Sequence, residues 1–125
     1  MTGKPNRIRH WDLDALTYES QYNAYAGRFF PMEGVDPPDW SGAWVAVAPG
    51  ETSTRHSHPE TEMFFFVRGT GVLRLGDEEH HVSPGDTVYI SPGVEHEMTN
   101  KGPDRLVFLD VWWIAPDDEK TVNVG

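Results

Sequence analysis

Two histidines that stand one residue apart, His56 and His58, are the residues whose spacing most clearly suggests chemistry. We predict that they lie in an extended run, and alternate residues of a strand project to the same face. Glu62 follows four residues later, and a third imidazole, His96, lies on a later predicted strand. The sequence therefore predicts that three imidazoles and one carboxylate converge.

These four side chains are the kind that hold one divalent transition metal. Imidazole and carboxylate accept zinc or iron, which we favour, as well as manganese or nickel. Four protein ligands would leave up to two positions of an octahedron open for substrate or water. The chain has no cysteine, which excludes thiolate metal sites, disulfides and thiol nucleophiles.

The elements that must position these ligands are short runs of β-branched and aromatic residues between Gly and Pro turns. This pattern of short runs and turns predicts an all-β domain. Residues 11–18 fit either a helical turn or an edge strand. The predicted strands are Tyr22–Phe30, Gly42–Ala48, Thr54–His58, Met63–Val67, Gly71–Leu75, His80–Ser83, Thr87–Ile90, Glu95–Asn100 and Arg105–Ile114.

Two of the predicted strands are apolar on both faces. Neither Met63–Val67 nor the run from Leu106 to Trp113 alternates cleanly between apolar and polar residues. Such strands fit a two-sheet jelly roll that has a covering layer or a subunit interface outside. We therefore expect a homodimer.

Length and charge limit the remaining possibilities. The 125 residues fit one domain, 1–125, with a barrel core over about 22–114 and a charged, loosely ordered tail over 115–125. The net charge of −10 argues against nucleic-acid binding, which needs a basic surface. No signal sequence or run of eighteen apolar residues is present, so we expect a cytoplasmic protein without membrane contact.

The full spacing resembles the two motifs of the cupin superfamily. The first, Gly50-x5-His56-x-His58-x3-Glu62-x6-Gly69, matches the family's G-x5-H-x-H-x3,4-E-x6-G at every fixed position. The second family motif, G-x5-P-x-G-x2-H-x3-N, is matched by Gly85, Gly93, His96 and Asn100, with Ser91 in place of the first proline. The resemblance implies a double-stranded β-helix barrel whose metal is held by His56, His58, Glu62 and His96. It implies no particular reaction, because cupins include enzymes, sugar sensors and storage proteins.

Seven further residues are candidates for a substrate pocket. Phe64 and Phe66 share the face of Glu62, and Met98 shares that of His96, while Asp110 interrupts an apolar strand and needs a partner if buried. Plain core packing is an equally good explanation for the aromatic residues. The full set is Tyr25, Trp44, Phe64, Phe66, Met98, Asp110 and Trp112. Arg28 and Arg55 could meet an anionic substrate, although single arginines are more often surface charges.

Four short segments are similar to the cupin portion of hydrazine-forming synthetases. They are Gln21–Ala26, Trp40–Trp44, Ser53–His58 and Val111–Trp113. In that family a methionyl-tRNA-synthetase-like module activates an amino acid, and the zinc-bound cupin joins it to an N-hydroxylated amine. The likeness implies zinc, N–N bond formation and a separate synthetase-like partner. An iron-dependent dioxygenase and a non-catalytic small-ligand-binding cupin are the alternatives.

Overall fold

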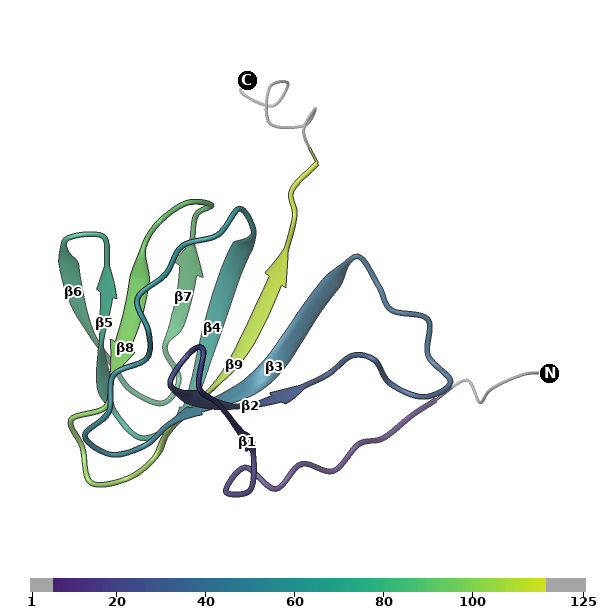
Figure 1. Ribbon diagram of the computed structural model, residues 1–125, viewed down its shortest axis with the longest axis horizontal. Helices are drawn as coiled ribbons and strands as arrows, with labels where there is room; N and C mark the ends of the chain where they lie inside the picture. Colours follow the sequence, from purple (N-terminus) through teal and green to yellow (C-terminus); the bar gives the residue numbers. More distant parts are fainter. Residues whose placement is uncertain (1–5, 117–125) are drawn as a thin grey trace.

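The computed structural model describes residues 6–116, which form two antiparallel sheets facing each other (Figure 1). Six strands in the order β1-β2-β3-β9-β4-β7 form one sheet, and β6-β5-β8 form the other. Their bounds are β1 Thr17–Glu19, β2 Ala24–Arg28, β3 Trp40–Val47, β4 Thr61–Arg68, β5 Gly71–Leu75, β6 Glu78–Val82, β7 Thr87–Ile90, β8 His96–Thr99 and β9 Leu106–Trp113. This is the predicted all-β double-stranded β-helix.

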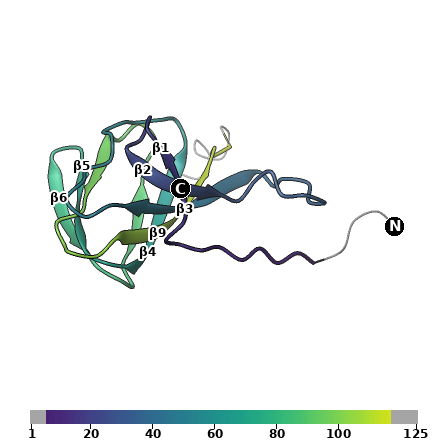
Figure 2. The same cartoon turned by 60° about the horizontal axis from the view of Figure 1, so that its bottom comes forward.

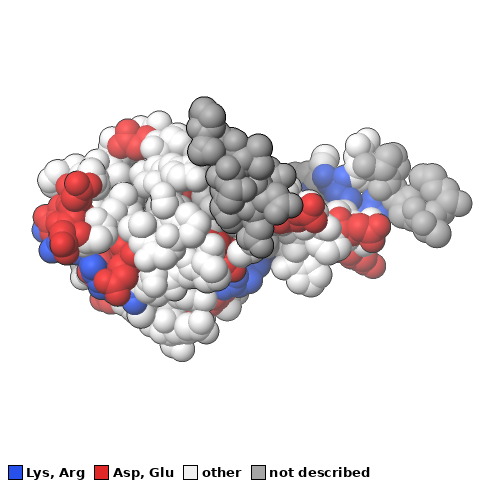
Figure 3. Space-filling model, turned by 90° about the horizontal axis from the view of Figure 1, so that it is seen from above, with Lys and Arg blue, Asp and Glu red and all other residues white. Residues whose placement is uncertain are grey.

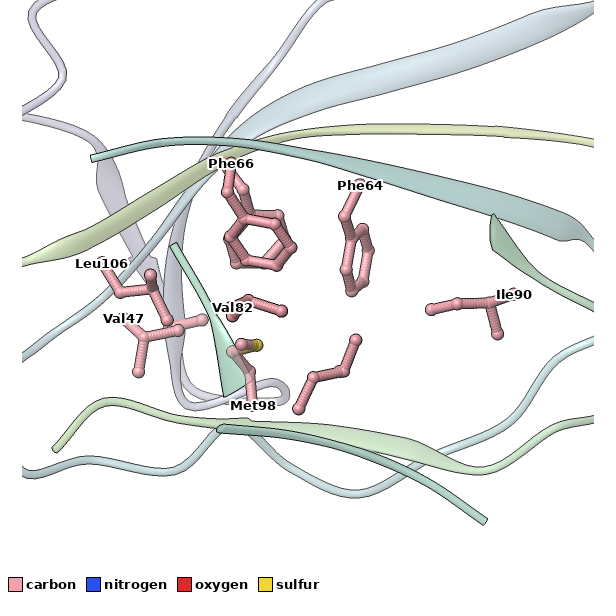
Figure 4. Close-up of a cluster of buried hydrophobic side chains, with 10 residues drawn as sticks. Val47, Phe64, Phe66, Val82, Ile90, Met98 and Leu106 are labelled. Atoms are coloured by element: carbon pink, nitrogen blue, oxygen red, sulfur yellow. The ribbon is translucent and has the colours of Figure 1, made fainter. Parts of the chain in front are cut away.

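The core lies between the two sheets, because strand side chains alternate between the two faces. On β4, Phe64 and Phe66 are buried, and on β8 Met98 is 2% exposed. Figure 4 shows the two phenyl rings side by side and Met98 entering from the opposite sheet. These side chains pack with Phe108 of β9 in one cluster, which fixes the inner face of each strand.

The outer face of the six-stranded sheet is also apolar. The segment before β1 covers one part of it, where Leu16, Ala46 and Val107 form a second buried cluster against Trp11 and Trp44. The rest, which we call the outer face, is contiguous because its strands are hydrogen-bonded neighbours. It consists of Met63, Phe65, Tyr89, Leu109, Val111 and Trp113.

The segment between β2 and β3 projects from the barrel, and the N-terminal segment extends on the same side (Figures 1 and 2). Arg7 Nε of the N-terminal segment donates to Glu33 O of the projecting segment at 3.2 Å, and Arg9 Nη1 donates to Arg28 O at the end of β2 at 3.4 Å. On the face that Figure 3 shows, charged side chains gather over this projection and at the opposite end of the molecule.

The predicted strand Thr54–His58 is wrong. These residues belong to a loop. Only isolated bridges form there, from Thr52 to Thr99 and from His56 to His96, because no neighbouring strand pairs with the loop along its length. The first predicted strand is also shorter than expected, since Asn23 has a positive φ of 53° and β2 begins at Ala24. The predicted loose tail falls, from residue 117 onward, outside the described residues.

Within residues 6–116, no helix is long and apolar enough to cross a membrane.

Candidate metal centre

His56 and His96 are brought together by their main chains. His56 N donates to His96 O at 3.2 Å, and His96 N donates to His56 O at 3.0 Å. The next histidine is fixed by the turn before β8, because Gly93 N donates to His58 O at 2.9 Å. The loop 49–60 and the start of β8 are therefore held together at the residues that carry the imidazoles.

Each imidazole has one nitrogen held by a backbone carbonyl. Nδ1 of His56 lies 2.9 Å from Thr54 O, and Nδ1 of His96 lies 2.9 Å from Val94 O. Nδ1 of His58 lies 3.2 Å from the carbonyl oxygen of Glu60. A carbonyl only accepts hydrogen bonds, so each Nδ1 carries the proton and each Nε2 presents its lone pair. The ligand atoms of the three histidines all lie within 4.8 Å of one another.

Glu62 lies beside two of these histidines. Its Oε1 is 2.9 Å from His58 Nε2 and 3.1 Å from His96 Nε2. Nε2 of His96 is nevertheless buried and has no hydrogen-bond partner of good geometry. A buried nitrogen left without a donor or acceptor is costly. Three imidazole nitrogens and one carboxylate oxygen thus fit a divalent transition metal.

The electrostatics of the cluster favour a cation. Burial raises the pKa of Glu62, but His96, Asp110 and His58 outweigh it and lower that pKa to about 2. Burial lowers the pKa of His96, but the Glu62 carboxylate and the Val94 carbonyl outweigh it, so the pKa is raised. Both shifts show that the site stabilises negative charge on the carboxylate and positive charge beside it.

A cavity of about 470 Å³ opens from these ligands. Five of the predicted pocket residues line it, namely Tyr25, Phe64, Met98, Asp110 and Trp112. Tyr25 lies at the border of this cavity. Its ring also packs against the second buried cluster, that of Leu16, Ala46 and Val107, and the Arg105 guanidinium carbon is 4.6 Å from the ring centroid.

Two predicted pocket residues lie elsewhere. Trp44 points out of the barrel toward Phe29, with the ring centroids 6.4 Å apart, because Ala43 and Val45 take the inner positions on β3. Phe66 is on the inner face but deeper, where its ring centroid is 5.1 Å from that of Phe108. Both are packing residues and do not line the cavity.

Asp110 is the carboxyl group on the inner face of β9. Burial raises its pKa well above the usual range, and the hydrogen bond and negative charge of Glu62 raise it further. Its Oδ1 is buried and without a hydrogen-bond partner. The sequence predicted that a buried carboxyl group here would need a partner, and among residues 6–116 one oxygen of Asp110 has none.

Sequence reasoning missed the cavity residues that come from loops and turns. Tyr22 lines the cavity, and its ring centroid is 5.4 Å from that of His56. Gln21, Ser53, Ser57 and Glu60 border the same space. Strand alternation gives no signal for such residues, although the short segments Gln21–Ala26 and Ser53–His58 contain four of the five.

Comparisons with known proteins identify the family and the fold of the chain. Residues 43–112 match the family model described as a cupin domain. The protein plu4264 from Photorhabdus luminescens is 36% identical and covers 94% of this chain and 93% of its own, with a TM-score of 0.79. A Cupin 2 conserved barrel domain protein from Salinispora arenicola CNS-205 is 30% identical, covers 90% and 92%, and has a TM-score of 0.80.

One similar protein has an enzyme's name. The (R)-mandelonitrile lyase of Granulicella tundricola is 36% identical over 66 residues, which are 52% of this chain and 50% of the lyase. The chain spans about half the length of several curated proteins that it matches, from 45% to 53%. The residues that match the cupin-domain model, 43–112, contain both the histidine loop and β8.

Proposed function

The chain belongs to the cupin family, and from this premise we propose that it is a mononuclear metalloenzyme acting on a small molecule. His56, His58, His96 and Glu62 would hold one divalent transition metal, and the substrate would occupy the adjoining cavity. When bound, such a metal supplies Lewis-acid polarisation of a substrate atom. The observation that carries the proposal is the convergence of three imidazoles whose ligand atoms lie within 4.8 Å of one another, with the Glu62 carboxylate 3.1 Å from His96 Nε2.

The chain's own residues prepare this site in two ways. The carbonyls of Thr54, Glu60 and Val94 orient the rings, so little reorganisation is needed when a ligand binds. Phe64 and Trp112 give the cavity an apolar wall, which excludes water and strengthens polar interactions inside it.

The finer proposal is a zinc enzyme that forms an N–N bond between amino-acid-derived substrates, with a separate synthetase-like partner. It rests on the resemblance to hydrazine-forming synthetases. The position of two of the similar segments, at the border of the cavity, supports it. Five residues of Gln21–Ala26 border the cavity, as do Ser53, Ser57 and the histidines of Ser53–His58.

The proposed step balances without an outside oxidant. The partner would activate the carboxyl group of one amino acid, and the hydroxylamine oxygen of the other substrate would take up the acyl group. The amino nitrogen of the first then forms the N–N bond as the N–O bond breaks. The carboxylate leaves with the electron pair of the N–O bond, and the attacking nitrogen loses one proton.

We further propose that two copies of the chain associate through the outer face. Six apolar side chains lie there side by side, and Tyr89 is 58% exposed. Apolar patches of this kind mark interaction sites more often than free surface. Burial of both faces of the sheet would then explain why β4 and β9 carry apolar residues on both sides.

Elemental analysis tests the metalloenzyme proposal. The full chain would be purified without added metal or chelating resin, beside His96→Ala and the control His81→Ala, which changes an exposed histidine of β6. We expect about one zinc per chain, lost in His96→Ala and kept in His81→Ala. Iron with the same pattern would favour the dioxygenase, to be checked by oxygen consumption. No metal in any sample, and none taken up on titration, would overturn the proposal.

A further inference from the structure

Arg55 is the side chain that connects the histidine-bearing loop with both neighbours of His96. Its Nε and Nη2 share Glu95 Oε1, at 3.1 and 3.0 Å, and its Nη1 lies 3.2 Å from Glu97 Oε1. Nη2 also donates to Gly76 O at 3.1 Å. One guanidinium thus contacts the residue on each side of His96 and the turn between β5 and β6.

These contacts lie directly beside the backbone bridge of the metal centre. Arg55 precedes His56, whose main chain hydrogen-bonds in both directions to that of His96. Gly76 N donates to Glu95 O at 2.8 Å, so the turn and the start of β8 are also joined to each other. Arg55, which the sequence offered as a contact for an anionic substrate, does not line the cavity, whereas His56 does. The guanidinium therefore acts on this region from outside the cavity.

A guanidinium is well suited to hold three segments together. Its N–H groups are fixed in one plane, so they can bind several acceptors at once in a defined geometry. Ion pairs with exposed side chains add little to the overall stability of a fold, and the Arg55 side chain is 32% exposed. We therefore expect its effect to be local and to fall on the placement of the loop. Contacts behind metal ligands orient those ligands in this way.

We propose that Arg55 is a positioning residue of the metal centre, whose guanidinium holds the loop against β8 and the β5–β6 turn so that His56 and His96 keep the spacing that a metal requires. The inference rests on the proposed function in that these histidines are the ligands of the proposed metal. Charge alone predicts the opposite effect of Arg55, because removing a positive charge near the site favours a bound cation. The two explanations therefore differ in sign.

Arg55→Gln and the matched control Arg74→Gln test the proposal. Arg74 of β5 also pairs with Glu97 Oε1, at 3.9 Å, and its second ion pair is with Glu79 at 3.4 Å. Both substitutions remove one positive charge beside Glu97, but only Arg55 belongs to the loop. We expect the affinity for zinc, measured by competition with a chelator, to fall about tenfold in Arg55→Gln and not to fall in Arg74→Gln. Unchanged or tighter binding by Arg55→Gln, or an equal loss in both variants, would overturn the inference.

The geometry of the bound metal gives a second readout. Cobalt would replace zinc, and its visible absorption spectrum depends on the coordination geometry. We expect the bands to shift in Arg55→Gln and to stay at their wild-type positions in Arg74→Gln. Arg55→Lys keeps the charge but not the planar fork, so it too should lose zinc affinity, and it decides the matter if Arg55→Gln does not fold. A wild-type affinity in Arg55→Lys would overturn the inference.

Hydrogen exchange in the metal-free chain separates the two proposals. The amide protons of His56 and His96 form the backbone bridge, and their exchange would be followed by NMR on the chelator-treated full chain. We expect both amides to lose protection in Arg55→Gln and to keep it in Arg74→Gln. A wild-type chain that takes up no metal, together with this loss of protection, would contradict the metalloenzyme alone. A wild-type chain that takes up metal, with unchanged affinity and protection in Arg55→Gln, would contradict the role of Arg55 alone.

Discussion

The main chains of His56 and His96 hydrogen-bond to each other in both directions, at 3.2 and 3.0 Å. This small bridge joins two segments that lie 40 residues apart in the chain. It fixes the distance between two imidazole-bearing residues by backbone contacts alone, and the ring centroids are 4.5 Å apart. The backbone therefore sets the relative position of two of the four candidate ligands.

Glu62→Gln should weaken metal binding more than Glu60→Gln, the same change at a nearby carboxylate. Glu62, with a pKa of about 2, is ionised at neutral pH and lies 2.9 Å from His58 Nε2, so glutamine removes one unit of negative charge at the site. We expect the affinity for zinc to fall at least about tenfold, by analogy with the loss of a supporting group at metal sites. Titration against a competing chelator measures this.

Glu60→Gln is the matched control for that prediction. The Glu60 carboxylate approaches the Nδ1 side of His58, at 3.4 Å, whereas its carbonyl oxygen orients the ring and is unchanged by the substitution. The Glu60→Gln affinity should stay close to that of the wild type. An equal loss in both variants would show that Glu62 acts through the general charge of the cavity and not as a ligand.

Sequence reasoning identified the candidate metal ligands because three of the four are close together in the sequence. His56, His58 and Glu62 lie within seven residues, and His96 follows a turn marked by Pro92-Gly93. The extended strand expected around the first two histidines is absent, yet their rings still converge, with centroids 5.5 Å apart. Their arrangement depends on hydrogen bonds to carbonyls, which spacing alone does not reveal.

The cavity walls were harder to predict because they depend on which way each strand faces. The alternation from Glu62 correctly placed Phe64 on the inner face of β4, but it could not show that Phe66 lies deeper, against Phe108. Trp44 lies on a strand with apolar residues on both faces, so no polar residue marks its outer side. Tyr22 lies in a turn, where alternation does not apply.

Asn100→Ala should destabilise the fold without removing the metal. Asn100 is fully buried, and its Nδ2 donates to Val47 O at 2.9 Å and to Asp104 O at 2.8 Å. Its Oδ1 accepts from Gly102 N at 3.0 Å. Losing three hydrogen bonds, one of them fully buried, should lower the free energy of unfolding by about 3 kcal/mol, as measured by urea denaturation.

Thr99→Ala is the control for the decrease in the free energy of unfolding expected for Asn100→Ala. Its side chain makes one hydrogen bond, to Thr52 Oγ1 at 2.9 Å, so we expect a decrease of about 1 kcal/mol. Metal content should remain at the wild-type level in both variants. An Asn100→Ala protein as stable as Thr99→Ala would mean that the three bonds add little to the fold.

The two glycines that bracket the first histidine motif should respond differently to alanine. Gly50 and Gly69 have φ values of +81° and +79°, so each alanine would pay about 1 kcal/mol for the left-handed backbone. Only at Gly69 would the new Cβ also collide with the carbonyl oxygen of Arg105, whereas nothing lies within 4 Å at Gly50. We expect Gly69→Ala to lose about 2–4 kcal/mol in total. Equal urea midpoints for the two variants would contradict this account.

Tyr89→Glu should abolish the proposed self-association while leaving the fold intact. The Tyr89 side chain is 58% exposed on the outer face, opposite Met63 in the register of β4 and β7. A carboxylate there would have to be desolvated in a dimer but stays in water in a monomer. Sedimentation velocity should show a dimer for the wild type and a monomer for Tyr89→Glu, with unchanged metal content. Ile8→Glu, at a position 83% exposed outside the sheet, should remain a dimer. A monomeric wild type, or a dimeric Tyr89→Glu, would rule out this face as the interface.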